Sequence, residues 1–281
     1  MPRTVRLREL LLGVEGLALL RHLHDGDDAA AAARVEEVRR IVDDPVLAAG
    51  EPTVEAAPRD GYAAWAPGYD DDPDNIVIAL EEPALWSRIA DVAPGRALDA
   101  GCGTGRHARR LVDLGHDVVG VDLTPEMIDR ARGRVPEARF LEGDLRALPL
   151  PDAAFDLVVC GLALAHLPDL SPAVAELARV LRPGGRLLVS VLHPFQALLG
   201  WHAPFRDAGG RRAFVREHAQ AHADYLAAFA AHGLAVRGCE EPRMDAGHAR
   251  AKRRAYAAVP EATVAAYAGL PAVLVWDVER A

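Results

Sequence analysis

A short apolar run that ends in an aspartate and three alternating glycines constrains the fold of this chain more than any other feature. Ala97 and Leu98 fit a buried strand, Asp99 stands at its end, and glycines follow at positions 101, 103 and 105. Residues 106–114 then have the composition of a helix. A strand that turns through glycines into a helix brings bare backbone and a helix N-terminus against a ligand.

The spacing of the glycines separates this loop from two common phosphate-binding patterns. The dinucleotide fingerprint needs its third glycine three positions after the second, and that position is Arg106 here. The Gly-Lys-Ser/Thr sequence of the phosphate-binding loop is also absent. We therefore expect a nucleoside-like ligand without a pyrophosphate, and Arg106 disfavours a nicotinamide-dependent oxidoreductase.

Strands and helices alternate after the loop. A second apolar strand at 117–122 ends in Asp122, where a carboxylate can accept hydrogen bonds from two ribose hydroxyls. Further strands are expected at 138–145, 152–161 and 186–192, with a helix over 171–181. This alternation predicts a parallel α/β sheet that binds its ligand at the carboxyl ends of the strands.

Five stretches in this order resemble the core of class I S-adenosylmethionine-dependent methyltransferases, in their ubiquinone-type, small-molecule branch. They are Leu-Asp-Ala-Gly-Cys-Gly-Thr-Gly at 98–105, Gly-Val-Asp-Leu-Thr-Pro-Glu-Met at 120–127, Gly-Asp-Leu at 143–145, Phe-Asp-Leu-Val-Val-Cys at 155–160 and Leu-Arg-Pro-Gly-Gly-Arg-Leu at 181–187. The resemblance implies a Rossmann-like seven-stranded sheet, mostly parallel with an antiparallel last strand, and helices on both faces. It also implies S-adenosyl-L-methionine as the cofactor.

The resemblance further assigns contacts with the cofactor. Asp99 would face its amino or carboxyl end, Asp122 would bind the ribose hydroxyls, and Asp144 would lie beside the adenine. The expected cofactor-binding residues are Tyr69, Asp99, Gly101, Cys102, Gly103, Gly105, Asp122, Leu123, Met127, Asp144, Leu145 and Cys160. Met127 fits the hydrophobic core equally well.

Two histidines follow predicted strands at the edge where this fold does its chemistry. His193 is the first choice for a catalytic base and His166 the second, because a neutral imidazole can take the proton of a hydroxyl or a carbon acid. The alternative is a histidine that shapes the pocket without exchanging a proton. The expected substrate-binding residues are the aromatic Tyr62 and Trp65, and Trp201 and His202 in the stretch 193–212, which reads as irregular.

Composition limits the partners. The net charge of −9 predicts no broad basic surface, so we expect a neutral or cationic small-molecule acceptor and no nucleic acid. The three cysteines show no paired spacing, which suits a reducing cytoplasm and predicts no metal site. Glu9 and Glu15 interrupt the first apolar run, so we expect a cytoplasmic protein without an export signal or membrane span.

Two helices are expected at 4–24 and 29–43, followed by a linker rich in Pro, Glu and Ala. We therefore divide the chain into an N-terminal helical extension and linker, 1–58, and a methyltransferase domain, 59–281. The extension would act as a lid or as an oligomer contact, for instance in a homodimer. The resemblance implies methyl transfer to a small organic acceptor, and the breadth of the family suggests natural-product biosynthesis. The alternative is a cofactor-binding cyclase or isomerase that keeps the fold without methyl transfer.

Overall fold

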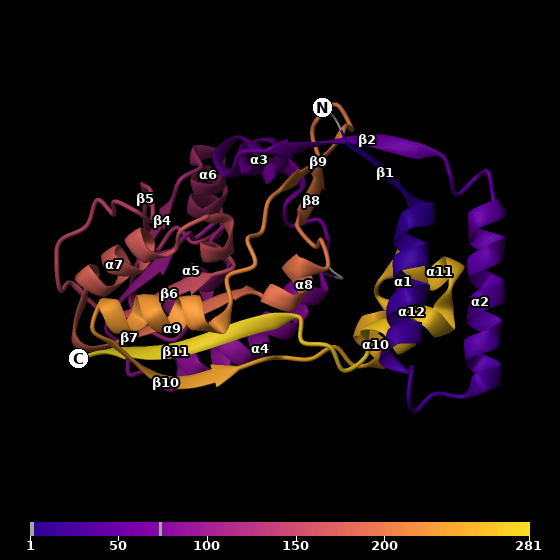
Figure 1. Ribbon diagram of the computed structural model, residues 1–281. Coiled ribbons are helices and arrows are strands. Elements are labelled where there is room, and N and C mark those ends of the chain that lie inside the picture. Colours follow the sequence, from indigo (N-terminus) through magenta and orange to yellow (C-terminus); the bar gives the residue numbers. More distant parts are fainter. Residues whose placement is uncertain (1–2, 73–74) are drawn as a thin grey trace. The chain divides into compact units, whose positions relative to one another are not determined.

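The computed structural model describes residues 3–72 and 75–281 and divides the chain into two compact units (Figure 1). One unit contains residues 1–54 and 243–270, and the other contains residues 55–242 and 271–281. The first unit holds the predicted helical extension together with residues 243–270, which the sequence assigned to the methyltransferase domain. The two units are therefore not consecutive along the chain.

The larger unit is built on a seven-stranded sheet. Its strands are β3 (Arg96–Ala100), β4 (Asp117–Asp122), β5 (Arg139–Glu142), β6 (Phe155–Gly161), β7 (Leu181–Leu192), β10 (Leu234–Glu240) and β11 (Val273–Arg280). They lie in the order β10-β11-β7-β6-β3-β4-β5. The five strands from β7 to β5 are parallel, whereas β11 runs antiparallel to both β7 and β10. The predicted fold class, including the antiparallel last strand, is confirmed.

The larger unit also contains helices, some of which cover the two faces of the sheet. The helices are α3 (Pro58–Trp65), η1 (Ala66–Gly68), α4 (Ile76–Ala90), α5 (Arg106–Asp113), α6 (Pro125–Arg134), η2 (Leu164–His166), α7 (Ser171–Val180), α8 (Pro194–Leu198) and α9 (His222–Ala231). Figure 1 shows α7 and α9 in front of the sheet and α4 behind it. Strand β7 accounts for this division, because Val189 and Val191 join the core that includes α7 and α9, while Ser190 between them bonds to Glu81 of α4.

The carboxyl ends of the parallel strands define the edge of the sheet where a ligand is expected. β3, β4, β6 and β7 run parallel, so they all end at one edge of the sheet. The register pairs Asp99 with Gly120 across β3 and β4, and Asp99 with Val159 across β3 and β6. The glycine loop therefore lies between the ends of two neighbouring strands, which is the usual place for a ligand in an open α/β sheet.

The smaller unit is mainly helical. Its elements are β1 (Arg3–Arg6), α1 (Leu7–Arg21), α2 (Asp28–Asp43), α10 (Ala246–Arg250), α11 (Arg253–Ala258), α12 (Pro260–Tyr267) and most of β2 (Gly50–Ala56). Leu11, Val14 and Ile41 are buried in its core. Arg21 donates hydrogen bonds to the carbonyls of Ala265 and Ala266, 3.0 and 2.8 Å away, near the end of α12. Residues 243–270 thus share one compact unit and its buried core with the N-terminal helices.

Several short strands were not predicted. β2 occupies the stretch that reads as a linker, and its first residues pair antiparallel with β1. β8 (Ala203–Arg206) and β9 (Arg212–Val215) form an antiparallel pair in the stretch that begins as irregular sequence at His193. These strands are only four to seven residues long. Among the helices of residues 3–72 and 75–281, none is long and apolar enough to cross a membrane.

Candidate active site

A pocket opens at the carboxyl edge of the sheet, next to the ends of β3, β4 and β6. Its lining residues are Tyr62, Tyr69, Gly101, Cys102, Gly103, Thr104, Arg106, His107, Asp122, Met127, Gly161, Leu162, Ala163 and His166. The first two come from α3 and the residue after η1, and the others lie at the ends of β4 and β6 or in the loops and helices that follow β3, β4 and β6. The pocket thus brings together the predicted glycine loop, Asp122, Met127, both tyrosines and one of the two predicted catalytic histidines.

The glycine loop has the backbone that its sequence predicts. Gly101, Gly103 and Gly105 have φ angles of +73°, +51° and +82°, which side-chain-bearing residues rarely adopt. A Cβ on Gly101 would lie 2.7 Å from the Cβ of Ala163, whereas a Cβ on Gly103 would meet nothing within 4 Å. The first glycine therefore allows close packing, and the second leaves its part of the pocket open for a ligand.

The two aspartates at the strand ends differ in their surroundings. Asp122 lines the pocket, and its carboxylate accepts hydrogen bonds from the amides of Gly103 at 2.8 Å and Thr124 at 2.9 Å. Asp99 is fully buried and accepts the amide of Ala108 in α5 at 2.8 Å. Burial raises the pKa of Asp99 to about 6. Asp99 does not line the pocket, so in this structure it holds the loop and helix in place.

A buried carboxylate in α4 fixes the cationic wall of the pocket. Glu81 has no exposed surface, and its Oε2 atom lies 2.6 Å from Nη1 of Arg106. Its Oε1 atom accepts the hydroxyl of Ser190 at 2.7 Å and lies 3.0 Å from Nε2 of His107. Burial alone would raise the pKa of Glu81, but its contacts with His107 and Arg106 outweigh burial and hold the pKa at about 2.

Sequence reasoning missed this carboxylate and its partners. The available signal was the pair of glutamates at 81 and 82 inside α4, a helix of otherwise mainly apolar residues. An acidic residue on the apolar face of a helix requires a buried partner. Nothing in the local sequence indicates that the partner is Arg106, because the two residues are 25 positions apart.

Aromatic side chains form the opposite wall. Trp65 stacks between Tyr62 and Phe205, with ring centroids 5.8 and 5.6 Å apart, and Tyr69 meets Trp65 edge-on at 4.9 Å. Of these, the two tyrosines line the pocket. Trp65, a predicted substrate-binding residue, is half-buried and supports Tyr62 from behind.

Polar contacts hold this aromatic segment against the glycine loop and α6. The carboxylate of Asp70 accepts the hydroxyl of Thr104 at 3.0 Å and forms an ion pair with Arg134 at 2.9 Å. Arg130 donates to the carbonyl of Pro67 at 3.3 Å. The segment that carries Tyr69 is therefore anchored directly to the loop whose ligand it would cover.

His166 has a defined tautomer. Its Nδ1 atom lies 2.8 Å from the carbonyl oxygen of Arg216, so Nδ1 must carry the proton. Its Nε2 atom is then an acceptor, and the hydroxyl of Tyr62 lies 2.7 Å away. Burial lowers the pKa of His166 and raises that of Tyr62 well above its usual range. A neutral imidazole and a neutral phenol therefore face the pocket as a hydrogen-bonded pair.

A second carboxyl with little exposed surface, Glu217, lies beside this pair and was not predicted. Its Oε1 atom is 3.6 Å from Nε2 of His166, and its Oε2 atom is buried without a hydrogen-bond partner among residues 3–72 and 75–281. Burial raises the pKa of Glu217 to about 8. At neutral pH this side chain is therefore mainly a neutral carboxylic acid.

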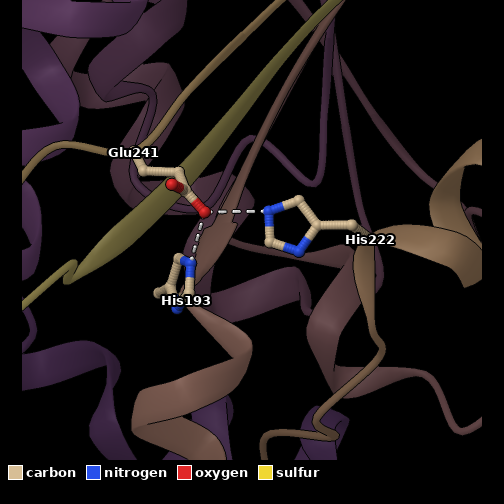
Figure 2. A group of neighbouring side chains, drawn as sticks. All are labelled: His193, His222 and Glu241. Carbon is tan, nitrogen blue, oxygen red and sulfur yellow. Dashed lines mark hydrogen bonds and ion pairs between the residues drawn. The ribbon is translucent and has the colours of Figure 1, made fainter.

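His193, the first choice for the catalytic base, does not line the pocket. Its Nδ1 atom accepts the amide of Phe195 at 3.2 Å, and its Nε2 atom lies 3.0 Å from Glu241 (Figure 2). Both ring nitrogens are thus engaged by the protein. The geometry favours His166 over His193 for contact with an acceptor in this pocket.

Leu123, Asp144, Leu145 and Cys160 were also predicted to bind the cofactor, but they do not line the pocket. Leu145 lies near the loop, with its Cδ1 atom 3.8 Å from the position of a Cβ on Gly101, while Leu123 is half-buried outside the pocket lining. Asp144 is paired with Arg146 at 2.6 Å. Cys160 has no exposed surface, so the expectation that it contacts the cofactor is corrected: its side chain is sealed in the core.

The two residues predicted in the loop after β7 also lie outside the pocket lining. The ring of His202 stacks on Phe214 with centroids 5.0 Å apart, and its Nδ1 atom accepts the amide of Glu217 at 3.3 Å. Trp201 is half-buried, and its amide donates to the carbonyl of Gln196. His202 thus positions the backbone that carries Glu217.

Comparisons with known proteins agree with this geometry. Residues 98–189 match the family model of a methyltransferase domain. The malonyl-[acyl-carrier protein] O-methyltransferase of Serratia marcescens is 47% identical over 100 residues, which cover 35% of this chain and 39% of that protein. The demethylmenaquinone methyltransferase of Deinococcus radiodurans is 38% identical over 144 residues, covering 47% and 59%. The chain thus spans less than two thirds of these curated relatives.

A solved structure extends the similarity to most of the chain. The S-adenosylmethionine-dependent methyltransferase of Mesorhizobium loti is 28% identical with a TM-score of 0.55, and the match covers 73% of this chain and all of that one. The sheet order, the glycine loop and these comparisons agree. Residues 98–189 therefore form a methyltransferase domain, and the larger unit has the fold and the glycine-loop motif of class I S-adenosylmethionine-dependent methyltransferases.

Proposed function

We propose that this chain transfers a methyl group from S-adenosyl-L-methionine to a small organic acceptor that carries a hydroxyl or an acidic carbon. One observation carries the proposal: the glycine loop, Asp122 and the neutral His166 line the same pocket. A donor held by the loop and an acceptor held by the histidine would then meet in one cavity. Proximity and orientation of this kind supply about 7–11 kcal/mol in well-aligned reactions.

The residues of the loop side fit the cofactor. Asp122 would accept the ribose hydroxyls, because each of its oxygens retains acceptor capacity beyond the amide bonds of Gly103 and Thr124. The open space at Gly103 would admit the nucleoside, and Arg106 would bind the carboxylate of the methionine part. When bound, the cofactor supplies a methyl group activated by a positively charged sulfur.

The residues of the aromatic side would manage the acceptor proton. Tyr62 donates to Nε2 of His166, so its oxygen can accept the proton of an incoming hydroxyl while its own proton moves to the imidazole. The carbonyl of Arg216 holds the ring in place from the other nitrogen. The neutral acid Glu217, beside the ring, could release its proton to solvent as the imidazole gains one, since its side chain is 10% exposed. One proton would thus leave for each acceptor proton that the Tyr62–His166 pair takes up, and the pocket would not end with a net positive charge.

We infer the chemical class of the acceptor from the geometry of the pocket and not from the names of the relatives. The matched stretch 98–189 includes the loop side and His166 but neither Tyr62 nor Glu217. The stacked rings of Tyr62 and Trp65 favour a flat, mainly apolar acceptor, and the net charge of −9 favours a neutral or cationic one. We also propose that the methyl transfer serves natural-product biosynthesis.

Label transfer tests the proposal. The full chain would be incubated with methyl-labelled cofactor and panels of phenols, carbon acids and amines, with Asp122→Ala as the control that lacks the ribose contact. We expect label in a phenol or carbon-acid product, and much less label with the control at a cofactor concentration near the wild-type dissociation constant. Cofactor binding without label transfer to any panel would instead support the cyclase or isomerase alternative. Label in amines alone would contradict the assigned role of His166.

A further inference from the structure

A cluster of two histidines and one glutamate lies at the carboxyl end of β7, outside the lining of the methyltransferase pocket. His193 directly follows β7, His222 is the first residue of α9, and Glu241 directly follows β10. Figure 2 shows the three side chains converging, with the Oε1 atom of Glu241 between the two rings. That oxygen lies 3.0 Å from Nε2 of His193 and 2.9 Å from Nε2 of His222.

The fold holds these side chains in place. His193 is buried, and its amide donates to the carbonyl of Ala272 at 2.9 Å. The ring of His222 packs edge-on against Trp276 of β11, with centroids 5.8 Å apart. Because the three residues come from three elements anchored on one sheet, their convergence does not depend on the folding of a single surface loop.

The donor set has the chemistry of a transition-metal site. One ligand atom from each of the three residues lies within 4.8 Å of the other two. Ligand atoms around a tetrahedral ion with bonds of about 2.1 Å are roughly 3.4 Å apart, close to the contacts observed. Two imidazole nitrogens and one carboxylate oxygen suit zinc and its first-row neighbours better than calcium or magnesium, which prefer oxygen ligands.

The exposure of the cluster indicates how an ion could enter. The side chain of His193 is 8% exposed, whereas those of His222 and Glu241 are 40% and 34% exposed. One ligand would therefore close the inner side of the site, and two would face solvent. Three protein ligands leave a coordination position open to water or a small molecule, as in catalytic rather than structural zinc sites.

We propose that His193, His222 and Glu241 bind one divalent transition-metal ion through Nε2, Nε2 and a carboxylate oxygen. The sequence predicts no such site, because the ligands lie 48 and 19 residues from Glu241 along the chain. The ion would join β7, α9 and β10 at the sheet edge. The site does not depend on methyl transfer, so it can be tested independently of that activity.

One contact sets a requirement for binding. The amide of Phe195 donates to Nδ1 of His193, which places the proton of the neutral ring on Nε2, toward Glu241. The metal must displace that proton, and Nδ1 must then give up its contact at the start of α8. Metal binding should therefore alter the environment of α8, which a simple His–Glu–His hydrogen-bonded cluster would not do.

Cobalt binding tests the proposal on the full chain, free of affinity tags and stripped with a chelator. Titration with Co²⁺ should give visible absorption bands that saturate at one ion per chain, and Zn²⁺ should remove them. His222→Ala and Glu241→Gln should each weaken binding at least about tenfold. The matched control is His248→Ala, since His248 forms a 2.7 Å pair with Asp245 outside the three-residue cluster, and it should bind cobalt like the wild type.

A rescue variant separates ligand loss from structural damage. His222→Cys places a thiolate at the same position, so cobalt binding should return with a sulfur-to-cobalt charge-transfer band. Loss of cobalt binding in His222→Ala with an unchanged circular-dichroism melt supports the site. Absence of saturable cobalt bands in the wild type, or equal binding by His222→Ala and the wild type, would overturn it and leave a hydrogen-bonded cluster only.

Discussion

The two sides of the methyltransferase pocket are built in different ways. The loop side consists of residues 99–127, which form two consecutive strand–helix connections. Backbone amides hold these connections together; for example, the amide of Gly103 donates a hydrogen bond to the carboxylate of Asp122. The aromatic side joins Tyr62, His166 and Glu217, which come from distant parts of the chain and meet through side chains. The first side is specified by local backbone geometry and the second by tertiary packing.

This difference predicts different consequences of mutation. Changes on the loop side should weaken cofactor binding and leave the chemistry of the bound complex intact. Changes on the aromatic side should lower turnover with little effect on cofactor affinity. Variants on each side therefore test whether cofactor binding and proton transfer are separate properties of the pocket.

The largest effect is expected at the glycine loop. Gly103→Val should abolish cofactor binding, because the branched side chain resists a φ of +51° and projects into the open part of the pocket. Circular dichroism should remain native-like while cofactor titration gives no signal. Gly133→Ala is the control: its added Cβ would also meet nothing within 4 Å, but it lies in α6 away from the pocket. Normal cofactor binding by Gly103→Val would place the cradle elsewhere.

A smaller effect is expected on the aromatic side. His166→Ala should lower turnover by about 10²–10⁴-fold with little change in cofactor affinity, because the acceptor proton loses its destination. Tyr62→Phe removes the hydroxyl that bonds to His166 but leaves Nε2 of His166 open to accept the acceptor proton directly, so it should lower turnover by only about tenfold. Steady-state kinetics on an acceptor found by label transfer would measure both. Near-native turnover of His166→Ala would mean that the acceptor arrives already deprotonated.

The sequence located the loop side of the pocket because its determinants are local. Alternating glycines after an acid at a strand end are compatible with few backbone arrangements, and Asp122, Gly103 and Met127 line the pocket, while their contacts with a cofactor stay predictions. Cys160 was misplaced because strand β6 is buried on both faces, so adjacency to the strand end did not bring it to the surface. The pattern of apolar residues in a sequence indicates which side chains are buried, but it does not indicate which of the buried side chains line a cavity.

The aromatic side was predicted only in part, for a physical reason. Tyr62 and His166 were singled out separately, but no local pattern shows that they bond to each other. Glu217 has no sequence signal, since its raised pKa arises from burial by segments far away in the chain. The same applies to residues 243–270, whose place in the smaller unit depends on contacts of α12 with α1 such as those of Arg21.

The neutral state of Glu217 predicts a pH-dependent stability. Its pKa is about 8 in the folded chain against an ordinary value of 4.5, so the folded state favours the protonated form. This contribution to stability is complete below about pH 4.5 and is lost as pH rises to about 8. Glu217→Gln cannot ionise and should exceed the wild type in unfolding free energy by about 2–4 kcal/mol at pH 9, but not at pH 4.5.

Denaturant unfolding across this pH range would measure the difference. The exposed Glu261→Gln is the matched control and should follow the wild-type curve. If the curves of Glu217→Gln and the wild type run parallel from pH 4.5 to 9, Glu217 is ionised in the folded chain at neutral pH. The proton transfer assigned to the aromatic side would then need a different partner.

Cofactor binding by the Asp122→Ala variant tests the central claim most directly. S-adenosylhomocysteine would be titrated by calorimetry into the wild type, Asp122→Ala and Asp129→Ala, the last an exposed aspartate of α6 paired only with Arg132 among the ion pairs of the described chain. The account predicts one site per chain, a loss of about 1.5–3 kcal/mol for Asp122→Ala because the ribose loses a charged acceptor, and no loss for Asp129→Ala. An unchanged dissociation constant for Asp122→Ala would contradict it.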